Sequence, residues 1–280
     1  MATPRTTQAE AFLKKFHDRR PGLTSKAFSS LPVHLDGVQY PSTYHLLAST
    51  IAHSADGCEV LDLACGDGYL LSLIASAADS RAALYGIDMS FGELAAAATR
   101  LGSRATLTSG RAQELPYRAG QFDAVVCHMA LMLMEDLDLV LTEVRRTMRP
   151  KGTFAGVVGA PAPPSPALTK FIDVFSRCSR HPEWEGLRLG DPRLRRKDGL
   201  IHVLSPKFEV SIIQDLPLSL RLDPESLWLW LLDTYDLDLL KPECLPDAKS
   251  DLLRSLETER DADGKVEFRQ MLRYFSATVT

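Results

Sequence analysis

The sequence lacks several features that would fix its class at once. Its five cysteines are odd in number, scattered and never spaced as C-x-x-C, which argues against a disulfide framework and a zinc site. No apolar run approaches the roughly 20 residues of a membrane-spanning helix. The polar N-terminal stretch has apolar residues at helical spacing, unlike a signal peptide. We therefore expect a cytoplasmic protein with no metal and no membrane segment.

The chain also lacks a strong charge of either sign. Its 32 Lys and Arg residues against 36 Asp and Glu residues give a net charge of -4, which offers no general attraction for a polyanion. One short basic cluster is interrupted by acids and has no interleaved aromatic residues, as is typical of a solvated surface: Arg188, Arg193, Arg195, Arg196 and Lys197. We expect no nucleic-acid partner.

What the sequence does have is an alternation of short β-like runs with helical runs between about residues 56 and 160. This pattern predicts an α/β fold with a parallel sheet flanked by helices. The expected strands are 58–64, 82–88, 104–110, 122–129 and 153–159. The clearest helix follows residue 135, ends at Pro150 and Gly152, and has one apolar face: Leu137, Val140, Leu141, Val144 and Met148.

After residue 160 the pattern changes to a proline-rich connection followed by mixed elements. We expect helices at 167–180 and 246–259, and a strand or strand pair at 207–222. Asp223 as N-cap and Pro224 at the first helical position predict a helix that carries two tryptophans. An alternating stretch predicts a last strand at the C-terminus.

The stretch VLDLACGDGYLLSLIA, residues 60–75, joins a strand to a helix through a glycine-rich turn. A dinucleotide fingerprint needs a third glycine where Leu71 stands, and no Gly-Lys-Ser or Gly-Lys-Thr follows as in a P-loop. The next strand ends in GIDMS, so Asp88 can accept hydrogen bonds from both ribose hydroxyls and Met89 can pack on a purine. The pattern favours a nucleoside ligand without phosphates.

Five segments in order resemble the class I S-adenosylmethionine-dependent methyltransferases, more narrowly the small-molecule type: DLACGDG, GIDMS, SGRAQELPY, FDAVVCHMAL and LTEVRRTMRPKGTFAGVV. The resemblance implies an α/β, Rossmann-like, seven-stranded, mostly parallel sheet with helices on both faces, an antiparallel last strand and helical lid insertions. It places the final strands near 207–215 and 268–279 and the insertions at 161–206 and 216–260. Within one structural domain, it implies an N-terminal helical cap (1–54), a cofactor-binding core (55–160) and a remainder (161–280).

The resemblance also implies a cofactor site for S-adenosyl-L-methionine, with S-adenosyl-L-homocysteine as product and no metal. Asp62 would reach the methionine amino group, Asp88 the ribose and Met89 the adenine. The other expected cofactor-binding residues are Ala64, Cys65, Gly66, Gly68, Ala112, Gln113, His128 and Met129. Two positions depart from the family: Ala64 replaces a glycine, and Arg111 replaces an acid that accepts the adenine amino group. Either Gln113 or a backbone carbonyl takes over that contact.

The sequence gives less information on the residues that would bind or activate the methyl acceptor. His128 is the candidate general base, with the alternative that it only lines the pocket. Candidate substrate residues are Tyr40, Arg195, Trp228, Trp230 and Tyr235. The alternative for the three lid aromatics is a place in the lid core, and the alternative for Arg195 is a solvated surface. His17, His34, Tyr44 and His45 of the cap are expected to be structural.

The leading hypothesis is a methyltransferase that acts on an O, N or C atom of a small molecule, as a monomer or homodimer. A second hypothesis is methylation of an acyl acid bound to an acidic carrier that docks on the basic cluster. A third is a protein that binds S-adenosylmethionine and does not methylate.

Overall fold

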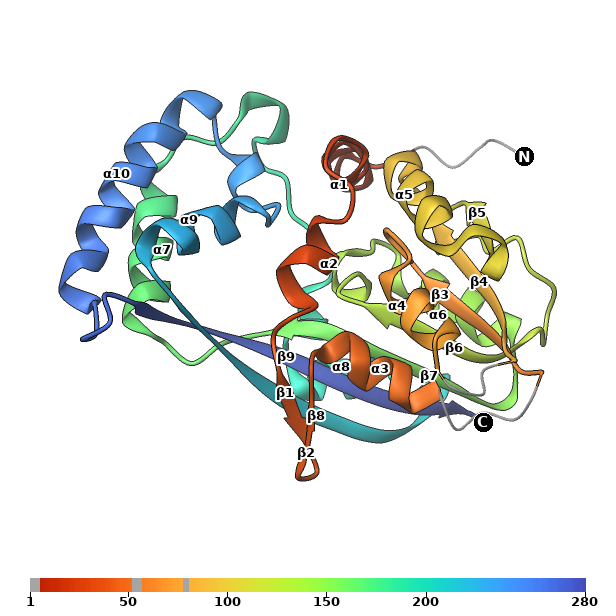
Figure 1. Ribbon diagram of the computed structural model, residues 1–280. Helices are drawn as coiled ribbons and strands as arrows, with labels where there is room; N and C mark the ends of the chain where they lie inside the picture. Colours follow the sequence, from red (N-terminus) through yellow and green to blue (C-terminus); the bar gives the residue numbers. More distant parts are fainter. Residues whose placement is uncertain (1–5, 52–56, 78–80) are drawn as a thin grey trace.

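A seven-stranded sheet runs through the centre of the molecule (Figure 1). The computed structural model describes residues 6–51, 57–77 and 81–280. The strand order is β5-β4-β3-β6-β7-β9-β8, and in this sheet only β9 runs against its neighbours. The strands are β3 (Glu59–Leu63), β4 (Ala83–Asp88), β5 (Ala105–Ser109), β6 (Phe122–His128), β7 (Met148–Ala160), β8 (Phe208–Leu222) and β9 (Val266–Val279).

Helices cover both faces of this sheet because its central strands are apolar on both sides. Val60 of β3 packs into one buried cluster, and its neighbours Leu61 and Leu63 pack into the other. The first cluster includes residues of α3 (Thr43–Ile51), α4 (Tyr69–Ala75) and α5 (Phe91–Leu101). The second includes residues of α6 (Leu137–Thr147) and α8 (Lys197–Leu204). Each fully buried leucine in these clusters contributes about 1.5–3 kcal/mol.

The chain order places a crevice at the carboxyl ends of the central strands. From β3 the chain proceeds outward through β4 to β5, and then crosses back to β6 on the other side of β3. Ligands of open α/β sheets bind where the strand order reverses in this way. The end of β3 and the start of the following loop therefore lie in the expected binding crevice.

Two further groups of elements pack around the sheet. The N-terminal cap contains α1 (Gln8–Arg19), α2 (Leu23–Phe28), β1 (Val33–Leu35) and β2 (Val38–Tyr40). The lid contains α7 (Pro166–Arg177), α9 (Pro224–Leu232) and α10 (Leu245–Leu256), which lie together at one end of the long β8–β9 ribbon (Figure 1). Short 3-10 turns complete the chain: 102–104, 131–133, 182–184, 192–195, 237–239, 242–244 and 257–259.

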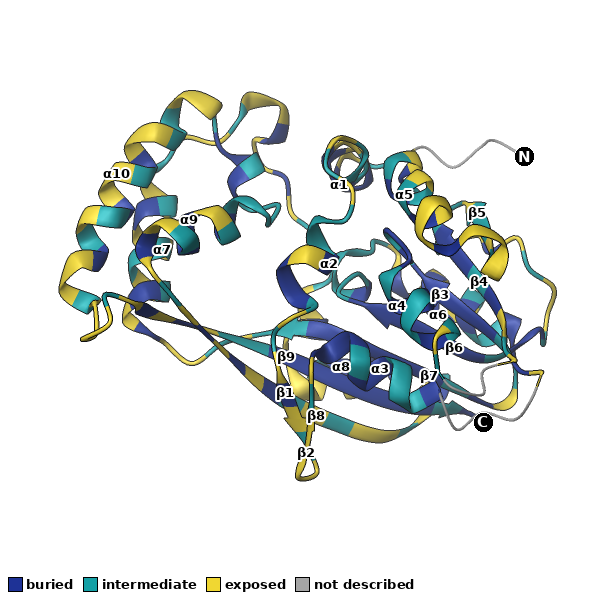
Figure 2. Cartoon of the chain, viewed as in Figure 1, coloured by how far each residue is buried: buried dark blue, intermediate teal, exposed yellow. Residues whose placement is uncertain are grey.

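The lid has its own apolar core, separate from the two clusters of the sheet. Trp228 and Leu227 of α9 pack with Leu252 of α10 and with Phe268 of β9. Figure 2 shows buried residues along the inner sides of the lid helices and exposed residues along the outer sides. Within the described residues, no helix is long and apolar enough to cross a membrane.

The predicted fold class is confirmed, with two corrections to the element bounds. The stretch at 207–222 is one strand, β8, so the second insertion begins at residue 223 instead of 216. Met148, predicted on the apolar face of a helix, is the first residue of β7 and pairs with Phe122. The helix therefore ends before Pro150, whose ring disfavours helical backbone at the preceding residue. The expected boundary between residues 54 and 55 lies outside the described residues.

Candidate active site

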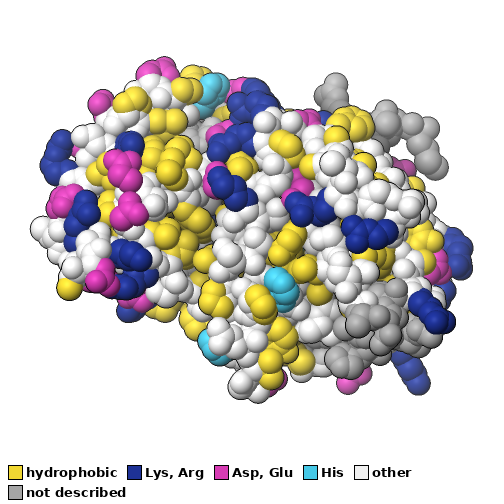
Figure 3. All heavy atoms as spheres, viewed as in Figure 1, with side chains coloured by type: hydrophobic (Ala, Val, Ile, Leu, Met, Phe, Trp, Pro, Cys, Tyr) yellow, Lys and Arg dark blue, Asp and Glu magenta, His cyan; other side chains and the backbone are white. Residues whose placement is uncertain are grey.

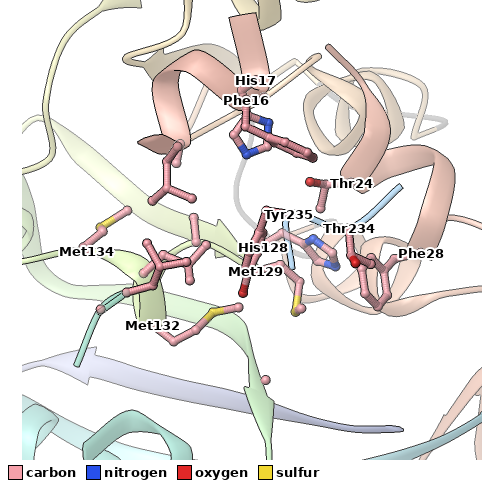
Figure 4. A pocket seen from close by; sticks show the side chains of 18 of the residues that line it. Phe16, His17, Thr24, Phe28, His128, Met129, Met132, Met134, Thr234 and Tyr235 are labelled. Carbon is pink, nitrogen blue, oxygen red and sulfur yellow. The ribbon is translucent and has the colours of Figure 1, made fainter. Parts of the chain in front are cut away.

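A cavity of about 890 Å³ lies between the carboxyl edge of the sheet, the cap and the lid. Figure 4 shows side chains of all three parts around it: Phe16 and His17 from α1, His128 and Met129 from the end of β6, and Thr234 and Tyr235 from the lid. Ligand pockets span roughly 300–1,000 Å³. This cavity is at the upper end of that range, so it can hold more than one small molecule.

The glycine-rich loop after β3 forms one wall of the cavity. Three of its residues have left-handed backbone: Ala64 at φ 60°, Gly66 at φ 53° and Gly68 at φ 73°. The Gly66 N–H donates a hydrogen bond to Asp88 Oδ2 at 2.9 Å, which ties the loop to the end of β4. Left-handed backbone costs an alanine roughly 1–2 kcal/mol, so Ala64 is held in this turn by its surroundings.

Two predicted loop residues have a packing role. Gly68 does not line the cavity, and a Cβ at this position would lie 2.7 Å from a methyl of Leu101 in α5. Cys65 lines the cavity but is buried, and its sulfur would lie 2.8 Å from a Cβ at Gly86. Burial raises the pKa of the Cys65 thiol well above its usual value, which argues against a nucleophile.

Asp62, the fourth residue of β3, carries a buried carboxylate at the cavity wall. It is 2% exposed and has neither a hydrogen-bond donor nor a cation as partner among the described residues. Burial raises its pKa well above the ordinary value, and the carboxylates of Asp88 and Asp67 raise it further. A buried carboxylate without a partner is costly, so this site fits a ligand that brings a positive charge.

Asp88, at the end of β4, is held in place by the backbone on both of its oxygens. Oδ2 accepts from Gly66, and Oδ1 accepts from the Ser90 N–H at 2.8 Å. Burial raises the pKa of Asp88, while these two backbone hydrogen bonds lower it. A carboxylate has about four acceptor positions, so two remain for hydroxyl groups of a ligand.

The predicted adenine residues lie along one side of the same cavity. Met89, Ala112 and Gln113 all line it, and Met89 packs against the apolar side chains of α1. The Gln113 side-chain amide donates to the Glu135 carbonyl at 2.9 Å and to Glu10 Oε1 at 3.2 Å. Both hydrogens of its amide are therefore engaged by the protein.

His128 lines the cavity at the end of β6 in an apolar setting. Its Nε2 shares a hydrogen bond of 2.8 Å with Thr43 Oγ1, and its ring stacks on Tyr44 with centroids 3.6 Å apart. Its Nδ1 has no partner among the described residues. Burial lowers the pKa of His128 to about 3. An imidazole with this pKa is neutral and weakly basic at pH 7, which argues against the predicted general base.

Of the predicted substrate residues, the structure brings two to the cavity. Arg195 and Tyr235 line it, and burial raises the pKa of Tyr235. Tyr40 ends the β2 strand and packs against the core, and Trp228 is buried in the lid core, so neither lines the cavity. Trp230 also lies outside the lining, because its Nε1 donates to the Ala27 carbonyl at 3.1 Å and its ring packs on Phe28.

Sequence reasoning predicted an N-terminal cap but missed the residues by which it contributes to the cavity. Tyr44, expected to be structural, lines the cavity and supports His128. Glu10 also lines the cavity. Its T-x-x-E spacing from Thr7 indicates only a helix-capping box, which the structure confirms. His17 lines the cavity and bonds Glu93 Oε1 through Nδ1 at 2.8 Å. No local pattern in the sequence signals these contacts, since their partners are about 75 to 100 residues away.

Comparison with known proteins finds similarity mainly in the part of the chain from β3 to β7. Residues 61–156 match a family model described as a methyltransferase domain. A 2-phytyl-1,4-naphtoquinone methyltransferase of Synechococcus elongatus is 32% identical over 124 residues, which cover 42% of this chain and 53% of that protein. A demethylmenaquinone methyltransferase of Symbiobacterium thermophilum is 31% identical over 107 residues, 36% of this chain and 43% of that protein. The chain thus spans about half the length of these relatives.

Solved structures support the same fold over a longer part of the chain. The crystal structure of the [4+2]-cyclase SpnF matches with a TM-score of 0.60 at 18% sequence identity, covering 98% of this chain and 96% of that one. At this identity the likeness establishes the architecture alone.

Proposed function

We propose that the protein transfers a methyl group from S-adenosylmethionine to a small molecule, because residues 61–156 match a family model described as a methyltransferase domain. The observation that carries the proposal is the pair of carboxylates at the ends of β3 and β4. Asp62 faces the cavity without a partner, and Asp88 keeps two free acceptor positions. The first suits an ammonium group and the second suits the two hydroxyls of a ribose.

The chain's residues would hold this cofactor in three parts. Asp62 would bind the methionine amino group, and the backbone of Ala64 and Gly66 would let the methionine arm approach closely. Asp88 would bind the ribose, and Met89 would pack on the adenine. All of these residues line one continuous cavity. When bound, S-adenosylmethionine supplies an electrophilic methyl group on its sulfonium.

The main task left to the protein is to hold the acceptor in line and to exclude water, which can lower the barrier by several kcal/mol. His128 and Tyr44 form a stacked, desolvated wall suited to this task. The lining also includes several apolar side chains, which favours an acceptor with an apolar body: Met132, Leu133, Met134, Leu187 and Leu189. Among the described residues, no three His, Cys, Asp or Glu side chains are grouped as metal ligands, and the proposal includes no metal.

Two alternatives remain as separate hypotheses. A carrier-bound acyl acid would use the basic cluster, but Arg196 is engaged by Asp198, and only Arg188 and Arg195 of the cluster line the cavity. A protein that binds the cofactor without methylating is the other alternative, since a chain of this fold is described as a [4+2]-cyclase. Incubation with a methyl-labelled cofactor and cell extract distinguishes these, because a labelled product forms only if the methyl group is transferred.

Titration calorimetry with S-adenosylhomocysteine tests the cofactor site directly. We expect binding at micromolar order and a loss of about thirtyfold or more in Asp88→Asn, because two hydrogen bonds to a charged group are weakened. Asp198→Asn is the matched control, since this carboxylate is exposed and does not line the cavity. Absence of binding by the unmodified protein would refute the proposed function.

A further inference from the structure

Helix α1 of the cap places the carboxylate of Glu10 next to the loop that follows β5. Arg111 follows β5 and stands where the resemblance of the sequence predicts an acid, and its guanidinium donates to Glu10 Oε1 from Nε at 3.0 Å and from Nη2 at 2.6 Å. The amide of Gln113 donates to the same oxygen at 3.2 Å. Three N–H groups of the loop after β5 thus converge on one carboxylate oxygen of α1.

Glu10 is buried, being 6% exposed, so it depends on these donors for its stability. Its second oxygen, Oε2, accepts only the Thr7 N–H, at 3.1 Å. Since each carboxylate oxygen has two lone pairs, Oε2 keeps one acceptor position. Glu10 lines the same cavity as Met89, Gly110 and Ala112.

Other contacts hold α1 across the site. Asp18 Oδ1, near the end of α1, accepts from the Ser90 hydroxyl at 2.8 Å and from the Gly92 N–H at 3.2 Å, directly after the end of β4. Glu10, near its start, lies over the loop after β5. Helix α1 therefore spans the ends of β4 and β5, which would flank an adenosine. The contacts at the two ends of the helix fix the position of the Glu10 carboxylate.

We propose that Glu10 accepts the hydrogen bond of the adenine 6-amino group, so that α1 is part of the cofactor site and Arg111 positions the acid. This inference rests on the proposed function, because it assumes that a nucleoside with an adenine base occupies the cavity. A carboxylate is a stronger acceptor than an amide. Glu10 would thus select adenine over a 6-oxo purine, which carries an acceptor in place of the amino donor.

The experiment compares S-adenosylhomocysteine with its inosine counterpart, in which a 6-oxo group replaces the amino group. Calorimetry gives the ratio of the two dissociation constants within each variant. We expect the unmodified protein to bind the adenine form tenfold or more tightly, because a hydrogen bond to a charged group is lost with the other form. In Glu10→Ala the ratio should fall to within about threefold of one. The control Glu114→Ala, an exposed glutamate of the same loop, should keep the full ratio.

The ratio is insensitive to partial unfolding, because only folded molecules bind either ligand. Glu10→Gln keeps the size of the side chain and serves if Glu10→Ala does not fold; it should lower the ratio at least threefold. An unchanged ratio in the foldable Glu10 variant would overturn this inference alone and leave the proposed function standing. If the unmodified protein binds neither nucleoside, both fall together.

Discussion

Ala64 has a backbone conformation that alanine rarely adopts, at φ 60° in the turn after β3. A glycine there would remove roughly 1–2 kcal/mol of strain and would cost about 0.4–1 kcal/mol through the entropy of the unfolded chain. We therefore predict that Ala64→Gly stabilises the protein by about 0.5–1 kcal/mol, or roughly 1–3 °C in Tm for a chain of this size. Thermal unfolding monitored by circular dichroism measures this.

Ala95 provides a control with the opposite sign. It is exposed in the interior of α5, so Ala95→Gly should destabilise by about 0.5–1 kcal/mol. If both glycine variants destabilise equally, Ala64 is not strained in the way its φ angle indicates.

Asp62 should make the stability of the protein depend on pH, because its pKa is raised in the folded protein by burial and by Asp88 and Asp67. In the folded state it binds a proton at pH values where the unfolded chain has lost it. Its contribution to stability is therefore most favourable below the unfolded pKa of about 4 and falls as pH rises toward the raised folded pKa. Asp62→Asn removes this penalty, so the variant should gain roughly 0.5–2 kcal/mol over the unmodified protein at pH 8.

Unfolding curves from pH 5 to pH 8.5 measure the difference between the two proteins, which should grow with pH. The same variant should bind S-adenosylhomocysteine far more weakly, since the ammonium loses its partner. An Asp62→Asn protein that is less stable at pH 8 would show that the carboxylate already has a stabilising partner.

At the scale of elements, the sequence predicts best where neighbours in the chain determine the structure. The strands from β3 to β7 and the turn around Gly66 follow from short apolar runs and glycine positions. Met148 was misassigned because it continues the helical spacing, whereas in the structure its backbone pairs with Phe122 of β6. The resemblance placed the end of β8 near residue 215, whereas the last residues of this strand pair with β9, more than forty positions later. Long-range pairing overrides the expectation in both cases.

The candidate site shows the same division between local and distant contacts. Asp62, Gly66, Asp88 and Met89 could be predicted because each lies at or just after the carboxyl end of a strand. For Trp228 the sequence left two alternatives open, a pocket wall and the lid core in which it lies, because an aromatic cluster has the same pattern in both. For the cap, tertiary contacts alone place the cavity-lining residues of α1.

At the scale of the whole molecule, the net charge of -4 offers no general attraction for a polyanion. Lys and Arg side chains lie scattered among Asp and Glu on the face seen in Figure 3. The basic cluster of the sequence is divided in the structure, since Arg193 pairs with Asp191 and Arg196 pairs with Asp198. Arg188 and Arg195 instead line the cavity, and neither forms an ion pair with a described residue. The cavity therefore combines apolar side chains with two arginines of the basic cluster, and Arg195 lies close enough to the Asp236 carboxylate to offset part of the rise that burial causes in the pKa of this group.

This combination predicts an acceptor with an apolar body and an anionic group. As probes we choose naphthoic acid and its methyl ester, which share the planar body and differ in charge. In the presence of S-adenosylhomocysteine, the acid should bind more tightly than the ester, and Arg188→Ala with Arg195→Ala should weaken acid binding about threefold to tenfold with little effect on the ester. The effect is modest because both guanidinium groups belong to exposed residues. Arg196→Ala, next in the chain but outside the cavity lining, should leave both affinities unchanged. Equal binding of acid and ester by the unmodified protein would show that the two arginines do not select an anion, and the acceptor would then be a neutral molecule.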